Sequence, residues 1–218
     1  QKQLRPGDFV VIQFGHNDQK HPHLQAYNGY PENLRRFIAE IRAKKALPIL
    51  ATPIARNTWT EQNGKLTYND LLHDHAQACI ALGKELNVPV LDLHQAAMED
   101  IIRLGRDASK IYYHQGDWTH TNDYGAVRAA GYAADALRSL GGTFPEYLPL
   151  IQAVSASIKP WKPEAALLLE KPVRLAGVKG PNGTEEGTAA QDHQAEKDGG
   201  DALARLLAAV QSARGQGG

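Results

Sequence analysis

The sequence predicts an α/β fold built on a parallel sheet. Short apolar runs of strand length alternate along the chain with longer segments whose apolar residues recur at helical spacing. This order is typical of parallel strands joined by crossover helices. The first apolar run also ends at a polar Gly-His-Asn-Asp turn, residues 15–18, as a buried strand does on reaching the carboxyl edge of such a sheet.

Taken in chain order, the alternation gives each element a place. We expect strands at residues 9–14, 48–52 and 88–93, and helices at roughly 31–44, 68–87 and 95–104. Pro31 suits the first turn of its helix. A fourth helix is expected from Asn122, where apolar residues recur at helical spacing, until the pair Gly141-Gly142 ends it.

The composition of the chain disfavours several classes of function. The 218 residues carry a formal net charge of zero, so no electrostatic field attracts nucleic acid or an anionic membrane, and we expect neither as a partner. No apolar run approaches the ~18 residues of a membrane span. The single cysteine, Cys79, lies among apolar helical residues and is expected to be a buried small side chain rather than a reactive thiol.

A second polar motif lies about a hundred residues after the first. Asp117 and His120 are three positions apart, just before the fourth predicted helix. One turn can therefore set a carboxylate against an imidazole, and an Asp that orients a His is the base half of a catalytic triad. The alternative is a polar loop whose histidine only caps the helix.

Together these motifs resemble the SGNH (GDSL-type) hydrolases, and within them the chain is similar to rhamnogalacturonan acetylesterases. The resemblance covers roughly residues 5–140. It implies a three-layer α/β/α, flavodoxin-like fold with no cofactor, and an esterase that removes acetyl groups from pectic or other polysaccharides through a Ser-His-Asp mechanism. Besides the two motifs, the segments that resemble the pectin-deacetylating subgroup are residues 15–20, 33–37, 52–56 and 91–94.

The resemblance also implies roles for individual residues. Asp117 and His120 would be the catalytic pair, with His120 as the base. Gly15 and Asn17 would belong to the oxyanion hole, where a neutral side-chain amide stabilises developing charge without titrating. Asn17 could instead be only a turn residue, since Asn suits left-handed turns.

Two blocks of the family pattern do not occur in this sequence. The nucleophile block, Gly-Asp-Ser, and a glycine block of the oxyanion hole should both lie before residue 8. None of the five serines reads as a nucleophile elbow; they are Ser109, Ser139, Ser155, Ser157 and Ser212. We therefore expect a fragment or a truncated gene product, N-terminally incomplete and inactive alone. The alternatives are a non-catalytic carbohydrate-binding pseudoenzyme and a fragment completed by another chain.

A missing strand would expose an apolar edge beside residues 9–14. Such an edge favours self-association or a complementing chain. Residues 164–179 could instead add a strand from within the chain. No secretory signal is visible, and the compartment stays open, with a secreted or periplasmic location compatible with an intact family member.

Further histidines have two interpretations each. His16, Trp118 and His114 adjoin the predicted site and form either a wall for a sugar ring or ordinary packing. Asp92 and His94 end a strand at the same sheet edge, which suggests a second triad, although a structural role is the commoner one. Two His-x-His pairs have zinc-like spacing but no third ligand nearby in sequence, so we expect no metal site; they are His21/His23 and His73/His75.

We expect three regions along the chain. Residues 1–143 form the partial hydrolase domain, and residues 144–160 form a C-terminal helix. Residues 161–218 form a low-complexity tail; its stretch 179–200 is rich in Gly, Glu, Asp, Gln and Thr, which predicts that the tail is largely disordered. A short amphipathic helix is expected near 201–214.

Overall fold

The computed structural model describes residues 3–159. Its central sheet has three parallel strands in the order β1-β2-β5. The register pairs Phe9 with Leu47 and Leu50 with Val90. The predicted parallel sheet is confirmed, with strands β1 (Phe9–Gln13), β2 (Leu47–Ala51) and β5 (Val90–Leu91).

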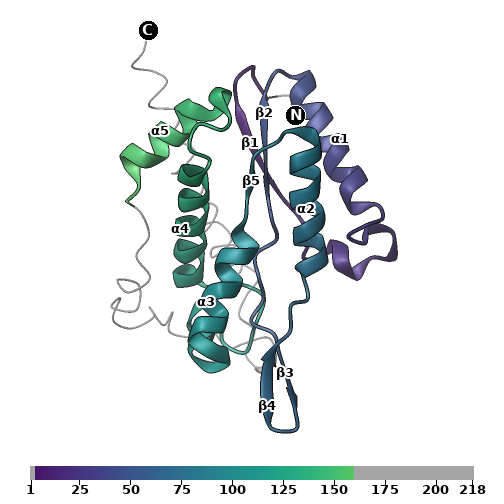
Figure 1. Cartoon of the computed structure of the whole chain (residues 1–218), viewed down its shortest axis with the longest axis vertical. Coiled ribbons are helices and arrows are strands. Elements are labelled where there is room, and N and C mark those ends of the chain that lie inside the picture. The colour runs from purple at the N-terminus through teal and green to yellow at the C-terminus, as the bar shows by residue number, and fades with distance from the viewer. Residues whose placement is uncertain (1–2, 160–218) are drawn as a thin grey trace.

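Helices cover both faces of this sheet (Figure 1). One side carries α1 (Tyr30–Ala43) and α2 (His73–Leu86); the other carries α4 (Asp123–Ser139) and α5 (Leu148–Ser157). Helix α3 (Leu93–Ala108) is interrupted at Gly105, whose φ of +79° is not helical. The predicted three-layer α/β/α architecture is therefore confirmed. Short 3₁₀ turns are η1 (Asp18–Lys20), η2 (Pro22–Leu24), η3 (Ser109–Tyr112) and η4 (Pro145–Tyr147).

Strand β2 shows how the two faces are filled. Successive side chains of a strand point to opposite faces. Leu50 packs into the core beneath α1 and α2, which also contains the buried Cys79, whereas Ile49 and Ala51 pack beneath α4 and α5. Because both faces are buried, β2 is apolar throughout rather than alternating with polar residues.

A β-hairpin after β2 was not predicted from the sequence. Strands β3 (Trp59–Gln62) and β4 (Lys65–Tyr68) are antiparallel and project from one end of the molecule (Figure 1). The helix expected from residue 68 begins only at His73, so that boundary was wrong. Asn63 and Gly64 have φ values of +52° and +73°, which two-residue hairpin turns require.

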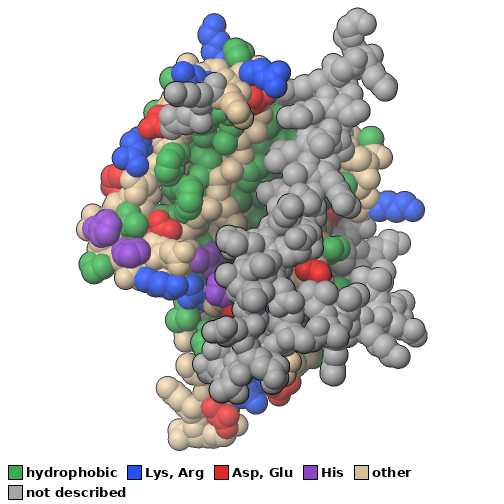
Figure 2. Space-filling view, turned by 180° about the vertical axis from the view of Figure 1, so that it is seen from behind, with side chains coloured by type: hydrophobic (Ala, Val, Ile, Leu, Met, Phe, Trp, Pro, Cys, Tyr) green, Lys and Arg blue, Asp and Glu red, His purple; other side chains and the backbone are tan. Residues whose placement is uncertain are grey.

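The strand β1 lies at one edge of the sheet. Among residues 3–159 it pairs with β2 alone. Beyond its end Phe14 is 47% exposed and stacks on Phe37 of α1, with ring centroids 5.5 Å apart. Hydrophobic side chains gather on the face opposite to that of Figure 1, as Figure 2 shows. Self-association or strand addition at this edge stays a prediction.

Several expectations concern the end of the chain. Helix α5 lies inside the range 144–160 where we expect a helix. The added strand at 164–179, the tail at 161–218 with its helix at 201–214, and Ser212 lie outside the described residues. No helix within residues 3–159 combines the length and apolarity needed to cross a membrane.

Candidate active site

The first motif forms a tight turn at the carboxyl end of β1. Gly15 is buried with φ of +133°, and a Cβ there would lie 2.8 Å from Cγ of Pro53. Only glycine therefore lets the turn pass so close to Pro53, in the segment that follows β2. The N–H of Gly15 donates to Oδ2 of Asp18 at 2.9 Å, which closes the turn.

The second motif forms a short closed loop ahead of α4. Tyr113 and Thr121 pair across its base in an antiparallel bridge, and the N–H of His114 donates to the carbonyl of His120 at 3.1 Å. Asn122 caps α4 by accepting from the N–H of Gly125 at 2.9 Å. Its amide also donates to the carbonyls of Ile111 and Tyr113.

Within this loop an aspartate and a histidine are in direct contact. Nδ1 of His120 lies 2.6 Å from Oδ2 of Asp117. Oδ1 of Asp117 accepts from the N–H groups of Thr119 and His120 at 2.6 and 3.1 Å, so its orientation is fixed by the loop backbone. The His120 side chain is 77% exposed, which leaves Nε2 facing the solvent side of the pair.

The segment after β2, residues 54–57, joins the two motifs. The ring of His16 contacts the carbonyl of Ile54, and Nη2 of Arg56 donates to the carbonyl of His16, both at 2.9 Å. On the other side the N–H of Asn57 donates to the carbonyl of Trp118 at 2.8 Å. Motifs a hundred residues apart in sequence therefore meet at the carboxyl edge of the sheet, where open α/β folds place their sites.

Charge within this region is arranged around Asp117. Burial raises the pKa of the Asp117 carboxyl, but hydrogen bonds from His120 and from two backbone N–H groups outweigh burial and lower the pKa below its usual value. Burial lowers the pKa of Arg56, an effect that the negative charge of Asp117 opposes. Arg56 stays a cation because an arginine titrates far above neutral pH.

The two residues expected in the oxyanion hole, Asn17 and Gly15, differ in their hydrogen bonding. Asn17 is exposed at the start of η1, and its Oδ1 accepts from Nζ of Lys20 at 2.9 Å. No described residue accepts a hydrogen bond from its Nδ2, which is the donor that an oxyanion needs. The N–H of Gly15 donates to Asp18, and the oxyanion role expected of Gly15 stays a prediction.

The expected substrate wall is only partly assembled. The Trp118 side chain is 55% exposed beside Asp117. His114 takes part through its backbone, which donates to the carbonyl of His120 and accepts from the N–H of Asp117. His16 belongs to the region through its ring, which contacts the carbonyl of Ile54 in the segment that joins the two motifs.

The suggested second triad does not form between Asp92 and His94. Asp92 caps α3, accepting from the N–H of Gln95 at 3.1 Å. The buried His94 instead places Nε2 at 2.9 Å from Oδ2 of Asp70 and Nδ1 at 3.2 Å from the carbonyl of Pro53. Both ring nitrogens are therefore used in linking β2, α3 and the loop before α2.

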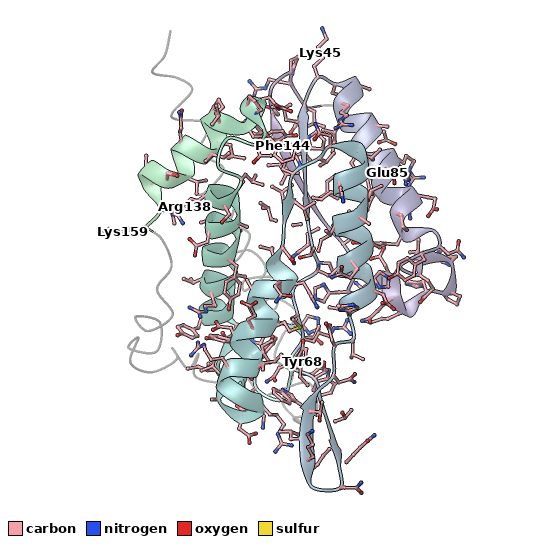
Figure 3. All side chains as sticks on the ribbon, in the orientation of Figure 1. Lys45, Tyr68, Glu85, Arg138, Phe144 and Lys159 are labelled. Carbon is pink, nitrogen blue, oxygen red and sulfur yellow. The ribbon has the colours of Figure 1, made fainter. Side chains whose placement is uncertain are left out.

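Sequence reasoning missed Asp70 and Arg56 as parts of this region. Asp70 follows the unpredicted hairpin, whose root is marked by Tyr68 in Figure 3; Tyr68 donates through its hydroxyl to the carbonyl of Arg56 at 3.0 Å. A signal for Arg56 was present, because a charged residue shortly after an apolar strand lies at the sheet edge that carries sites. Among residues 3–159 no cluster of three or more His, Cys, Asp or Glu side chains is placed to hold a metal ion.

The described serines lie apart from the Asp117–His120 pair in their hydrogen bonding. Ser109 is buried and donates to the carbonyls of Gly105 and Arg106. Ser139 and Ser157 donate to backbone carbonyls of their own helices. In the part of the chain that the structure covers, no serine hydroxyl contacts His120.

Comparison with known proteins settles the family. The family model of the GDSL-like Lipase/Acylhydrolase family matches residues 1–128, more than half of the chain. The chain belongs to this family. Its GDSL (SGNH) fold and acylhydrolase class agree with the parallel sheet and with the Asp-x-x-His spacing.

The chain is similar to two proteins that are named as rhamnogalacturonan acetylesterases and to one solved structure. The chain is 32% identical to the rhamnogalacturonan acetylesterase RhgT of Bacillus subtilis (strain 168), covering 66% of this chain and 67% of the relative. It is 30% identical to the probable rhamnogalacturonan acetylesterase YesY of the same organism, covering 69% of each. A crystal structure of the B. subtilis protein YXIM matches with a TM-score of 0.54 and 29% identity. That match covers 64% of this chain and 39% of the solved chain.

Proposed function

We propose that this chain carries the base half of a carbohydrate esterase that removes acetyl groups from pectic polysaccharide. The observation that supports it most is the 2.6 Å contact between His120 Nδ1 and Asp117 Oδ2, with the other face of the imidazole open. This is the geometry of a general base held by an orienting carboxylate. The names of the acetylesterase relatives supply the substrate class.

The proposed reaction has two halves. A serine Oγ attacks the ester carbonyl while its proton passes to Nε2 of His120, and Nδ2 of Asn17 donates to the oxyanion that forms. The bond from carbonyl carbon to sugar oxygen then breaks, and His120 returns the proton to that oxygen. Water, deprotonated by His120, hydrolyses the acetyl-serine in the same way, and Asp117 stabilises the imidazolium in both halves.

The nucleophile of this reaction is not assigned to any serine of the chain. No Gly-Asp-Ser occurs in the sequence, and no described serine contacts His120. We therefore propose that the serine comes from residues outside this sequence, on the same or another polypeptide. Loss of a triad nucleophile costs on the order of 10⁶ in turnover, so the chain alone is expected to lack useful esterase activity.

The test compares hydrolysis of p-nitrophenyl acetate by the chain and by a version extended at its N-terminus with a Gly-Asp-Ser strand. We expect activity only in the extended protein. In that background His120→Ala should reduce turnover by a factor on the order of 10⁶, whereas His23→Ala, which removes an exposed histidine of η2, should leave turnover unchanged. Activity of the unextended chain that depends on His120 would show a nucleophile within it and overturn the assignment.

A second candidate function is carbohydrate binding without catalysis. The absence of a described serine from the Asp117–His120 pair favours it, because a binding site needs no nucleophile. If the extended protein stays inactive while the chain retains an acetylated pectic oligosaccharide in equilibrium dialysis, binding alone is the function.

A further inference from the structure

His16 is a histidine in the candidate site to which the esterase mechanism gives no role. Its ring follows the Gly15 turn, and Nε2 lies 2.9 Å from the carbonyl oxygen of Ile54. A carbonyl oxygen only accepts hydrogen bonds, so Nε2 must carry a proton. The contact therefore fixes the ring orientation and leaves Nδ1 as the atom whose state depends on the surroundings.

The surroundings keep Nδ1 unprotonated. Burial, followed by the positive charge of Arg56, outweighs the opposing hydrogen bond to Ile54 and lowers the pKa of His16 to about 4, and His120 and His94 lower it slightly further. Arg56 is 8% exposed, and its Nη2 donates to the carbonyl of His16 itself. Because Arg56 binds the backbone carbonyl of His16, its permanent positive charge is held near the His16 ring. That charge opposes protonation of the ring.

An unprotonated Nδ1 is an acceptor, and in this structure it has no donor. No residue among those described donates a hydrogen bond to it, and the His16 side chain is only partly buried. The segment 54–57 that contacts His16 also binds the carbonyl of Trp118, next to Asp117, and so holds His16 at the same sheet edge as the proposed general base. We expect this acceptor to receive a hydrogen bond from a donor group of the substrate. The ester group itself carries no hydrogen-bond donor.

We propose that Nδ1 of His16 accepts a hydrogen bond from a free hydroxyl of the substrate sugar close to the acetyl ester, which makes His16 a specificity-determining residue. This rests on the proposed function, since it assumes a carbohydrate ester at His120. A site that hydrogen-bonds a hydroxyl discriminates against an analogue without it. For a partly exposed neutral hydrogen bond we expect about a tenfold preference.

The first measurement is the tautomer of His16, because it depends on no ligand and no activity. Two-bond ¹H–¹⁵N spectra of the chain labelled at histidine distinguish the two neutral tautomers and the imidazolium, and His16→Gln assigns the signals. We expect the Nε2–H tautomer at pH 7, persisting to about pH 5.5 because the ring titrates far below it. An Nδ1–H tautomer, or an imidazolium at pH 6, would overturn the proposal.

The second measurement uses two probes that differ in their hydroxyl donors. Methyl 3-O-acetyl-galactopyranoside has free hydroxyls beside the ester, and its 2,4-di-O-methyl analogue has none. We expect the first to shift the Nδ1 resonance of His16 upfield and to bind about tenfold more tightly than the second. His16→Phe keeps a ring of similar size but has no acceptor atom, so it should bind both probes equally.

The outcomes separate this proposal from the proposed function. If the probes shift His120 resonances while Nδ1 of His16 is unchanged, or if wild-type protein binds both probes equally, His16 is not the acceptor although the carbohydrate site stands. If neither histidine responds, both proposals fail together. A preference for the free hydroxyls that disappears in His16→Phe supports the assignment.

Discussion

Arg128 and Asp100 form an ion pair in which both side chains are buried, 2% and 6% exposed, between α4 and α3. The carboxylate of Asp100 also accepts from the hydroxyl of Tyr132 at 2.5 Å and from Nη2 of Arg103 at 2.6 Å. Arg128 in turn lies over the rings of Tyr112 and Tyr132. The pair therefore connects α3 to α4, the helix that follows the loop of Asp117 and His120.

We predict that Arg128→Ala lowers the free energy of unfolding by about 3 kcal/mol, because removing one partner leaves a buried charge without its main compensation. Arg103→Ala is the matched control. Arg103 contacts the same carboxylate, but its side chain is 45% exposed, and an exposed ion pair contributes less than about 1 kcal/mol. Urea denaturation measures both, and equal losses would mean that burial does not decide the contribution.

Much of the fold was predictable because it is local in sequence. The apolar runs indicated the strands of the sheet, and helical periodicity with caps indicated α1 and α4. The hairpin was missed because its strands, mostly exposed, have no apolar alternation, although Asn63-Gly64 was a usable signal. The Asp100–Arg128 pair was not predictable, since both residues lie within helical patterns and nothing in periodicity indicates that they meet.

The contacts of the candidate site likewise divide into those that the sequence could predict and those that it could not. The Asp117–His120 contact spans three residues, so spacing alone could suggest it. The state of His16 depends on a carbonyl 38 residues away and on Arg56 beside it, which only the folded chain brings together. The pairing of His94 with Asp70 rather than Asp92 likewise depends on the position of the hairpin.

The Gly15 turn provides a second prediction. Gly15→Ala adds a methyl group 2.8 Å from Pro53 Cγ at a φ of +133°, so strain and overlap should together cost about 3 kcal/mol. Gly64→Ala tests strain alone, because its φ is +73° and no atom lies within 4 Å of the added Cβ. We expect a loss of about 1 kcal/mol there. Similar losses in thermal denaturation would show that Pro53 moves aside.

The residue that caps the start of α4 provides a third prediction. Asn122→Ala removes the acceptor for the Gly125 N–H and the donor to two carbonyls, and should cost about 2 kcal/mol. Asn122→Ser keeps a capping oxygen without the amide donors, so it should recover part of that loss. Hydrogen exchange of residues 113–122 should become faster in both variants. If the serine variant were no more stable than the alanine variant, the carbonyl contacts and not the cap would carry the effect.

Acid conditions test the fixation of Asp117. Its pKa is lowered in the folded protein, so the stabilisation is present above the unfolded value of about 4 and is lost as pH falls through the folded pKa. We expect the melting temperature of the wild type to exceed that of Asp117→Asn at pH 6, and the difference to shrink as pH falls below about 4. Asp74→Asn, at an exposed position of α2, is the control and should follow the wild type throughout. A difference between wild type and Asp117→Asn that stays constant from neutral to acid pH would show that His120 and the loop N–H groups do not hold the carboxylate in its charged form.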